Sequence, residues 1–269
     1  MSVRESIDPR SSLWAWLAFD VWFYRTQKKL SLAQTAQIVK VARGTVSNWE
    51  AGRLRPSDEH MKRLDEAWET GGHFERLLFF ARTGHDPDWF RQYLQYESAA
   101  SIIKVHSGKA IPALLQTEDY MRALLTRAGV PDVERETQAR LKRQEILVRT
   151  EPPYLWVLID QEVLECKVGS GAVMGAQLQR LLDLSALHRV SVRVVPRSAG
   201  WHPGHDGTFQ VLKIGSREIA YAGAQIGGRL IEAGEEATIL AIRFDEIGAI
   251  ALHGDASLEL VEKAMRSYE

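Results

Sequence analysis

A single cysteine, Cys166, is present among 269 residues, which excludes an internal disulfide framework. Such sparing use of cysteine is typical of the reducing cytoplasm. No apolar run approaches the roughly 20 residues that a membrane-spanning helix needs, and residues 1–30 are too rich in charged and aromatic side chains for a signal peptide. We therefore expect a cytoplasmic protein that does not insert into a membrane.

The sequence also lacks the short motifs that mark most catalytic and cofactor sites. It has no phosphate-binding glycine loop, no Ser/His/Asp triad and no cysteine and histidine spacing typical of zinc sites. We accordingly predict no metal, no cofactor and no catalytic residue. Internal repeats and low-complexity segments are absent as well.

Net charge is small, but its distribution along the chain is uneven. The whole chain carries 34 Lys and Arg against 35 Asp and Glu, a formal net charge of −1. Residues 24–63 carry nine basic and three acidic residues, whereas residues 83–269 carry 21 basic and 25 acidic residues. A basic segment attached to an acidic body favours a nucleic-acid-binding module joined to a second domain.

Residues 30–56 predict two short helices joined by a tight turn. Ser31 and Gln34 form a capping box that begins the first helix, in which apolar and small residues recur at helical spacing. The second helix, residues 43–51, is expected to end at Gly52, whose backbone freedom suits a left-handed C-cap.

Residues 13–28 predict a helix whose apolar residues are not confined to one face. The main apolar stripe is expected to face the helix pair that follows, but Trp16, Phe19 and Phe23 lie off this stripe. A helix of this kind is buried on two sides. We expect its second side to be covered by the other domain or by the partner in a homodimer.

Two further helical segments complete an all-α domain of five helices at residues 1–85, and His-Asp-Pro at 85–87 marks the predicted boundary. Residues 86–269 alternate between strand and helix patterns, which indicates a mixed α/β (α+β) domain. Its strands are predicted at residues 101–110, 154–159, 190–195, 208–214 and 219–222. The order of these strands in a sheet does not follow from the sequence.

Residues 45–56 read T-V-S-x-x-E-x-G-x-x-x-P, a pattern that resembles the helix-turn-helix of the Cro/repressor (xenobiotic-response-element) family. The resemblance implies that the second helix enters the major groove of double-stranded DNA. It assigns DNA contact to Arg43, Thr45, Ser47, Asn48, Arg53 and Arg55. Arg43 and Asn48 are expected to read base edges, since Arg bonds guanine and Asn bonds adenine bidentately. The two later arginines are expected to bind backbone phosphates.

Three positions depart from the pattern of that family. Lys40 stands in the turn where glycine is common, and Ala42 stands at the N-cap where Ser or Thr is usual, a loss of roughly 1 kcal/mol. Leu32 replaces a glutamine that contacts phosphate in the family. These departures keep open a second interpretation, in which the helix-turn-helix is vestigial and the C-terminal domain holds the substrate pocket of a secondary-metabolism enzyme.

The second half of the chain contains five further motifs that occur in a fixed order. They are W-F-R-x-Y-x-x-x-E-x-x-A at 89–100, P-x-L-L-Q-T-E-D-Y-x-R-A-L at 112–124, R-x-x-R-Q-x-x-L at 140–147, G-A-V-M-x-A-Q-L-x-x-L-L at 171–182 and V-P-x-S-A-G-x-H-P-G at 195–204. Together they resemble the uncharacterised C-terminal domain of WhiJ-like actinobacterial regulators. The resemblance implies a DNA-binding developmental regulator, of a kind often encoded beside a small partner protein. Our leading hypothesis is a sequence-specific transcriptional regulator that binds DNA as a homodimer and whose C-terminal domain senses a small-molecule effector or a small protein partner.

A loop with the sequence W-H-P-G-H-D-G holds the polar candidates of the second domain. His202, His205 and Asp206, together with Arg143, are the predicted ligand-binding residues. Their H-x-x-H-D spacing matches no metal motif, and the pattern favours the alternative, in which these residues order the loop. A charged cluster of structural character is also expected from Glu97, Arg140, Arg143 and Asp160.

Overall fold

The structure is a computed structural model that describes residues 7–83, 89–224, 228–232 and 234–268. The chain divides into two compact units, residues 1–90 and 91–269. The predicted domain boundary at residues 85–86 lies outside the described residues. Within the described part of the chain, no helix is both long and apolar enough to cross a bilayer.

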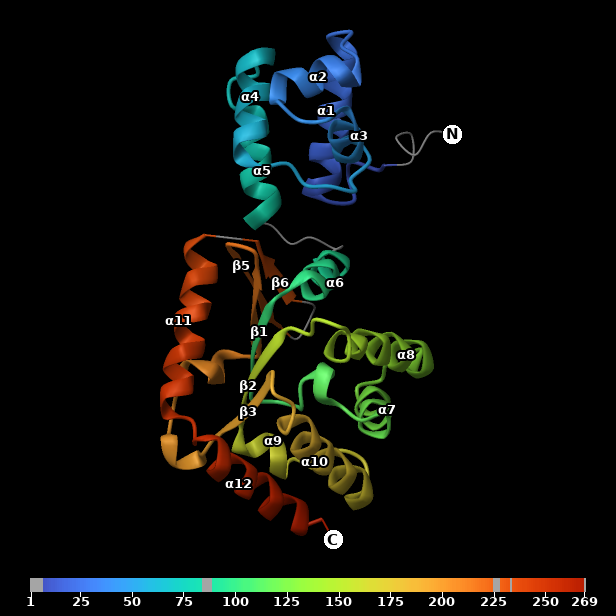
Figure 1. Cartoon of the computed structure of the whole chain (residues 1–269). Coiled ribbons are helices and arrows are strands. Elements are labelled where there is room, and N and C mark those ends of the chain that lie inside the picture. Colours follow the sequence, from blue (N-terminus) through green and yellow to red (C-terminus); the bar gives the residue numbers. More distant parts are fainter. Residues whose placement is uncertain (1–6, 84–88, 225–227, 233, 269) are drawn as a thin grey trace. The chain divides into compact units, whose positions relative to one another are not determined.

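The first unit is all-α and has the five helices that the sequence predicts. They are α1 (Leu13–Gln27), α2 (Leu32–Val39), α3 (Arg43–Glu50), α4 (Asp58–Trp68) and α5 (His73–Thr83). Figure 1 shows α4 and α5 running alongside the group formed by α1, α2 and α3. The core between them is apolar and includes Leu17, Val21, Val39, Val46, Trp49, Met61, Leu64, Phe74 and Leu78. Every helix thus buries one stripe against the others, as amphipathic helices do.

The second unit is organised around a mixed sheet of six strands in the order β3-β2-β1-β4-β5-β6, as far as the described residues show. The strands are β1 (Ile102–Ser107), β2 (Tyr154–Asp160), β3 (Val190–Val195), β4 (Phe209–Ile214), β5 (Arg217–Gly223) and β6 (Gly228–Ile231). The first three are parallel to one another, and the last three pair in antiparallel fashion. The strand β6 is not among the strands predicted from the sequence, because four residues that begin with glycine show too little alternation to be recognised.

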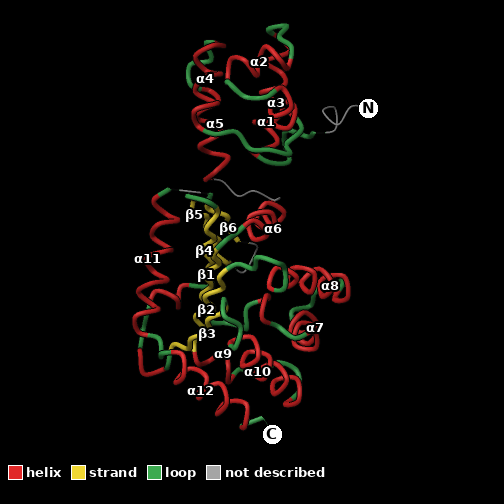
Figure 2. The backbone as a smooth tube through the Cα atoms, in the orientation of Figure 1, coloured by secondary structure: helices red, strands yellow, loops and turns green. Residues whose placement is uncertain are grey.

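Helices cover both faces of this sheet. They are α6 (Trp89–Ala99), α7 (Glu118–Arg127), α8 (Val133–Gln144), α9 (Gln161–Glu165), α10 (Gly171–Ser185), α11 (Glu235–Ile250) and α12 (Gly254–Arg266). Short 3₁₀ turns are η2 (Ala113–Leu115), η3 (Glu145–Leu147), η4 (Arg197–Ala199) and η5 (Pro203–Asp206). In the views of Figures 1 and 2, α11 lies on one side of the sheet, and α6, α7 and α8 lie on the other. The unit is therefore the mixed α/β domain that the sequence predicts.

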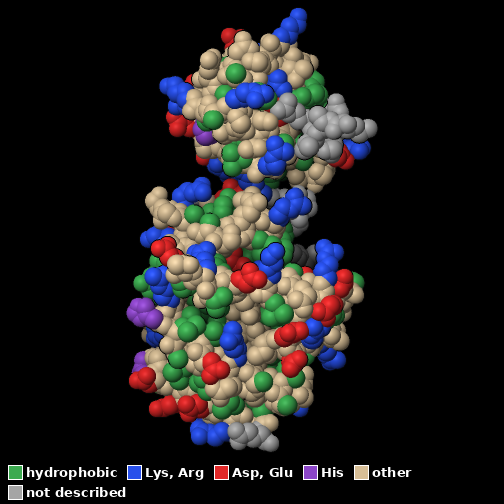
Figure 3. Space-filling model, turned by 45° about the vertical axis from the view of Figure 1, so that its right-hand side comes forward, with side chains coloured by type: hydrophobic (Ala, Val, Ile, Leu, Met, Phe, Trp, Pro, Cys, Tyr) green, Lys and Arg blue, Asp and Glu red, His purple; other side chains and the backbone are tan. Residues whose placement is uncertain are grey.

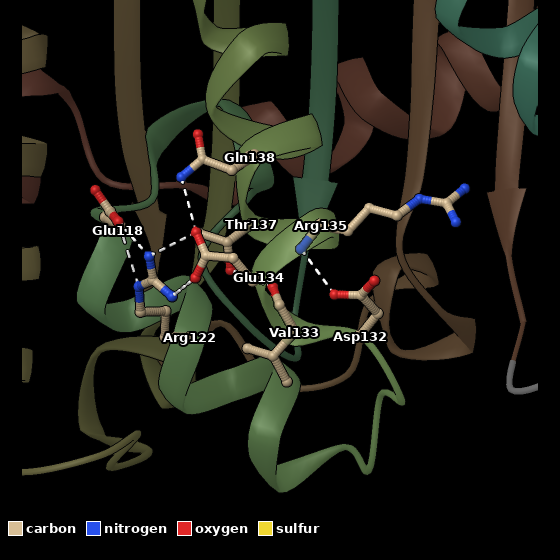
Figure 4. Close-up of polar contacts among 8 residues, drawn as sticks. All are labelled: Glu118, Arg122, Asp132, Val133, Glu134, Arg135, Thr137 and Gln138. Carbon is tan, nitrogen blue, oxygen red and sulfur yellow. Dashed lines mark hydrogen bonds and ion pairs between the residues drawn. The ribbon is translucent and has the colours of Figure 1, made fainter.

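Polar contacts at the surface join α7 to α8 (Figure 4). Arg122 donates to Glu118 one turn earlier on α7 and also forms an ion pair with Glu134 in the first turn of α8. Asp132 Oδ1 accepts the amide of Arg135 at 3.0 Å and so caps α8. Because these charges are solvent-exposed, they fix the geometry of the pair more than they stabilise it.

The path of the chain after β3 positions the candidate site of this unit. Since β1, β2 and β3 are parallel, their carboxyl ends lie at the same edge of the sheet. The next strand, β4, pairs with β1 in the opposite direction, with Phe209 opposite His106, and so begins at that edge. Residues 196–208 must therefore cross the carboxyl ends of β2 and β1 to reach the start of β4.

Candidate functional site

The helix-turn-helix of the first unit is formed by α2, a tight turn and α3. Ser31 Oγ accepts the Gln34 amide at 3.2 Å, and Gln34 Oε1 accepts the Ser31 amide at 2.8 Å, so the predicted capping box begins α2. Lys40 ends α2 with φ 56° and ψ 47°, a left-handed conformation that a non-glycine residue adopts at a cost. Ala42 precedes α3 and provides no side-chain cap. Lys40 and Ala42 therefore each lower the local stability of the turn.

A buried ion pair fixes α3 against α1. Glu50, at the end of α3, is 1% exposed and accepts two bonds from the guanidinium of Arg25. The same guanidinium donates to the carbonyl of Leu30 at 2.8 Å. Breaking a buried pair of this kind costs about 3–5 kcal/mol, since it leaves one charge buried without its partner. Tertiary contacts thus hold α3 in place although its N-terminus is uncapped.

The predicted DNA contacts lie on the side of α3 opposite the core, or just beyond its end. Arg43 is exposed, and Thr45, Ser47 and Asn48 are half-buried. Arg53 follows α3 and donates from Nε to Asn48 Oδ1 at 3.1 Å. In Figure 3, Lys and Arg side chains occupy the middle of the visible face of this unit, and acidic side chains stand at its edges.

Arg55 has a different environment from that of the other candidates. Its guanidinium carbon lies 4.1 Å from the centre of the Trp14 ring, a cation–π contact that anchors the chain after α3 to α1. The side chain is half-buried. A stacked guanidinium keeps its positive charge, so the contact positions Arg55 without neutralising it.

The charged cluster expected in the second unit separates into different groups. Arg143 on α8 forms a bidentate pair with the buried Glu97 on α6, at 2.8 and 2.9 Å. Tyr93 donates to Glu97 at 2.5 Å, and burial, followed by the neighbouring Glu97 charge, raises the pKa of its phenol well above the ordinary value. Arg140 instead pairs with Glu136 on its own helix. The expectation of one four-membered cluster is therefore corrected.

Arg143 also lies on the other face of the sheet from His202, His205 and Asp206, with which it was grouped. Tyr93, which the Arg143 guanidinium overlies at 5.6 Å, bonds Gln210. Gln210 neighbours Phe209 on β4, and successive side chains of a strand point to opposite faces. Phe209 packs with α11, so Arg143 and Tyr93 belong to the face away from α11. Arg143 is engaged in a structural pair there.

A buried cluster at the carboxyl ends of the parallel strands was not found from the sequence. His106 of β1 and Asp160 of β2 lie 3.0 Å apart, from Nε2 to Oδ1, and His202 Nε2 lies 3.4 Å from the same carboxylate oxygen. The exposed fractions of the three residues are 0%, 4% and 3%. Burial, partly offset by the Asp160 charge, lowers the pKa of His202. The edge formed by strand carboxyl ends is where open α/β sheets bind ligands.

Two glycines allow this cluster to close. A Cβ atom at Gly204 would lie 2.3 Å from His106 Cε1 and 2.8 Å from His202 Nδ1. A Cβ atom at Gly108 would lie 2.4 Å from Asp160 Oδ2. No real side chain tolerates such separations, so both positions are restricted to glycine by direct packing.

The other two loop candidates stand at the rim of this cluster. His205 is exposed, and its ring centre lies 4.2 Å from that of the buried His202. Asp206 is exposed as well and lies 3.8 Å from Arg243 of α11. His202 Nδ1 accepts the amide of Gly204 at 3.2 Å, so this histidine also orders the turn η5. The loop thus contributes one buried and two exposed polar groups.

A groove of about 390 Å³ opens between the sheet and α11. It is lined by Trp156, Val157, Leu158, Ser191, Arg193, Phe244, Asp245, Gly248 and Ala249. Lys104 borders it, with Nζ 2.8 Å from Asp245 and 5.3 Å from the Phe244 ring centre. Volume and lining are compatible with a small amphipathic molecule. None of the lining residues belongs to the five ordered motifs of the second half.

The sequence contained one usable signal for the buried cluster. His106 stands near the carboxyl end of an alternating segment, and Asp160 follows directly after the apolar run Tyr154–Ile159. Polar residues at such positions are candidates once the strands are known to be parallel. Strand direction was missing from the sequence, and His202 is 42 residues beyond Asp160, so no local spacing linked the three.

Two family models match the chain. A helix-turn-helix model matches residues 23–67, which lie within the first unit. A model described as a domain of unknown function (DUF5753) matches residues 90–263, well over half of the chain. No curated protein and no solved structure matches the chain. The helix-turn-helix expected from the residues around Thr45 is confirmed, and so is the two-part architecture.

Proposed function

The chain belongs to the DUF5753 family and carries a helix-turn-helix, and from this premise we propose that it is a sequence-specific transcriptional regulator that binds double-stranded DNA. The observation that carries the proposal is the presentation of Arg43 and Asn48 on a helix held rigidly by the buried Arg25–Glu50 pair. A recognition helix reads bases only if its scaffold fixes its orientation. The local excess of basic residues in 24–63 supplies the phosphate attraction that any such complex needs.

We further propose that the protein acts as a homodimer. One helix of eight residues contacts only a few base pairs, and helix-turn-helix proteins commonly double their site by binding two half-sites about 34 Å apart. Trp16 and Phe23 of α1 are 46% and 38% exposed, and Phe19 stacks on Phe23. Exposed aromatic residues of this kind are typical of association surfaces. Light scattering of the purified protein measures the mass directly.

The second unit is proposed to sense a small-molecule effector or a small protein partner. Its support is the buried His106, Asp160 and His202 at the strand ends, together with the groove beside α11. Both are enclosed or concave features that a helix-turn-helix protein does not need for DNA binding. Effector sensing requires that the ligand favour one of two conformations, so the affinity for DNA is expected to change when the effector binds.

An enzyme acting in secondary metabolism is the second candidate, and the specific observation in its favour is the location of that cluster. Buried titratable groups at the carboxyl edge of parallel strands are common in catalytic sites. However, none of the residues that line the groove belongs to the five ordered motifs. Residues of those motifs form structural contacts instead, such as the ion pair of Glu97 with Arg143. We therefore favour the regulator.

Footprinting on DNA upstream of the protein's own coding sequence tests the proposal. Wild-type protein is expected to protect a discrete site, and the logarithm of its affinity is expected to fall steeply with the logarithm of salt concentration. Arg43→Ala is expected to weaken specific binding about 10- to 100-fold, corresponding to about 1–3 kcal/mol for a lost bidentate base contact. Arg76→Ala on α5 removes an exposed arginine outside the helix-turn-helix and is the matched control. Equal affinities of the two variants would contradict the assignment of α3 as the recognition helix.

A further inference from the structure

The buried cluster of the second unit presents three ligand atoms to one point. His106 Nε2, Asp160 Oδ1 and one nitrogen of His202 all lie within 4.8 Å of one another. They come from β1, β2 and the loop after β3, so tertiary structure alone brings them together. We propose that His106, Asp160 and His202 bind one divalent transition-metal ion of the zinc class.

Two of the separations within the cluster lie close to those of tetrahedral coordination. Zinc–nitrogen and zinc–oxygen bonds of about 2.0–2.2 Å place neighbouring ligand atoms of a tetrahedron roughly 3.3–3.6 Å apart. The two imidazoles stand 3.0 and 3.4 Å from Asp160 Oδ1. A fourth position would remain for water or an effector, the arrangement of zinc sites with an open position.

The chemistry of the donor set selects the class of metal. Two imidazoles and one carboxylate suit zinc and its first-row neighbours, whereas magnesium and calcium prefer sites made entirely of oxygen. Among the described residues, no Lys or Arg forms an ion pair with Asp160, whose exposed fraction is 4%. A buried carboxylate needs a compensating positive charge. The metal ion would supply that charge.

Within the described part of the chain, His106 uses only one of its two ring nitrogens in polar contacts. His106 Nδ1 is buried and has no hydrogen-bond partner among the described residues. This ring therefore meets polar atoms through Nε2 alone, the nitrogen that faces Asp160. Nε2 is thus the nitrogen of His106 that could bind the ion, and coordination through it would place the ring proton on Nδ1.

Metal binding is expected to move the turn η5. In the metal-free state the Gly204 amide donates to His202 Nδ1, so a neutral His202 carries its ring proton on Nε2, 3.4 Å from Asp160 Oδ1. Coordination through Nε2 requires the proton on Nδ1, where it would face the Gly204 amide hydrogen. The turn must then shift, and Asp206 within it lies beside Arg243 of α11. The ion would thereby be coupled to the helix that borders the groove.

Cobalt titration of the full-length protein, after treatment with a chelator, tests this inference without any assay of DNA binding. We expect one Co²⁺ per chain, with the intense visible absorption of tetrahedral cobalt, and competition by Zn²⁺. His202→Gln and Asp160→Asn are expected to weaken the binding at least 10-fold. His188→Ala, which alters an exposed histidine of the second unit just before β3, is the matched control and is expected to bind as wild type does. Absence of saturable binding at one ion per chain in the wild type would overturn the proposal.

A second measurement covers the risk that substitutions in the cluster unfold the unit. An ion that binds only the folded state raises the melting temperature, and the rise grows with the logarithm of the ion concentration once that concentration exceeds Kd. Zn²⁺ is expected to raise the melting temperature of wild type and of His188→Ala. Binding of one ion with equal affinity by wild type and by folded His202→Gln would place the metal elsewhere and overturn the assignment. Because no step involves DNA, a failed footprinting experiment would leave this result unaffected.

Discussion

Arg53 Nε donates a hydrogen bond to Asn48 Oδ1 across 3.1 Å, which joins a predicted base-reading residue to a predicted phosphate-binding residue. The bond holds the Asn48 amide in one orientation, with its Oδ1 toward Arg53. Adenine recognition needs the NH₂ group and the oxygen of Asn together. Arg53 is thus positioned to orient the amide as well as to contact DNA.

Arg53→Ala is therefore expected to have two effects on DNA binding. Loss of a phosphate contact weakens binding to all sequences and lowers the salt slope by about one. Loss of the bond to Asn48 also relaxes discrimination at the base pair that Asn48 reads, by up to about 1–3 kcal/mol. Binding isotherms on matched and single-mismatch duplexes measure both. In a double-mutant cycle with Asn48→Ala the effects on discrimination are expected to be non-additive, and strict additivity would show that the bond has no role in the complex.

Ala42→Ser is expected to stabilise the helix-turn-helix. A serine hydroxyl at this N-cap can accept a hydrogen bond from the Thr45 amide of α3. In the structure this amide donates to the Ala42 carbonyl, and no side chain of the described residues caps the helix. Such a cap contributes about 0.5–2 kcal/mol. Native-state hydrogen exchange of the α3 amides measures the gain. Ala42→Val offers no hydrogen-bond acceptor and serves as the control. Equal protection of the α3 amides from exchange in the two variants would contradict the expected capping by serine.

His60→Gln is expected to remove part of the pH dependence of the first unit. His60 Nδ1 accepts from Ser57 at the start of α4, and burial, followed by the charge of Arg63, lowers its pKa. The unfolded chain therefore takes up this proton first, so stability is retained above about pH 6.5 and declines as the pH falls toward the lower folded pKa. Glutamine keeps the capping geometry without a titrating group.

Hydrogen exchange of the α4 amides between pH 7 and pH 5 checks this expectation for the first unit by itself, after correction for intrinsic exchange rates. The wild type should lose protection on acidification, and His60→Gln should lose less. His253→Gln changes an exposed histidine of the second unit and should follow the wild type. Superimposable profiles for wild type and His60→Gln would show that His60 does not link protons to folding.

Gly204→Ala is expected to destabilise the second unit, because the added Cβ would lie 2.3 Å from His106 Cε1. Overpacking of this kind typically costs about 1–3 kcal/mol. Gly175→Ala in the interior of α10 is the matched control, since nothing lies within 4 Å of its Cβ position. That variant should gain up to about 1 kcal/mol from helix propensity. Urea denaturation that ranks Gly204→Ala at or above wild type would contradict the close approach of the loop to His106.

The sequence by itself determined the local features of this protein. The Ser31 capping box, the left-handed residue at Lys40 and the uncapped Ala42 all follow from residues at most four positions apart, and the structure has each of them. Hydrophobic periodicity likewise predicted the five helices of the first unit and the alternation of the second. Such features depend on short-range backbone geometry, which a sequence pattern encodes directly.

Only the tertiary structure decided which distant residues meet. Arg143 pairs with Glu97, 46 residues earlier in the sequence. On the opposite face of the sheet, Asp160 lies close to His106, 54 residues earlier, and to His202. These groupings depend on strand order and on the crossing of residues 196–208 over the parallel strand ends. Strand order arises from long-range packing, which the spacing of residues along the chain does not encode. The cluster of His106, Asp160 and His202 can therefore be recognised only in the folded structure.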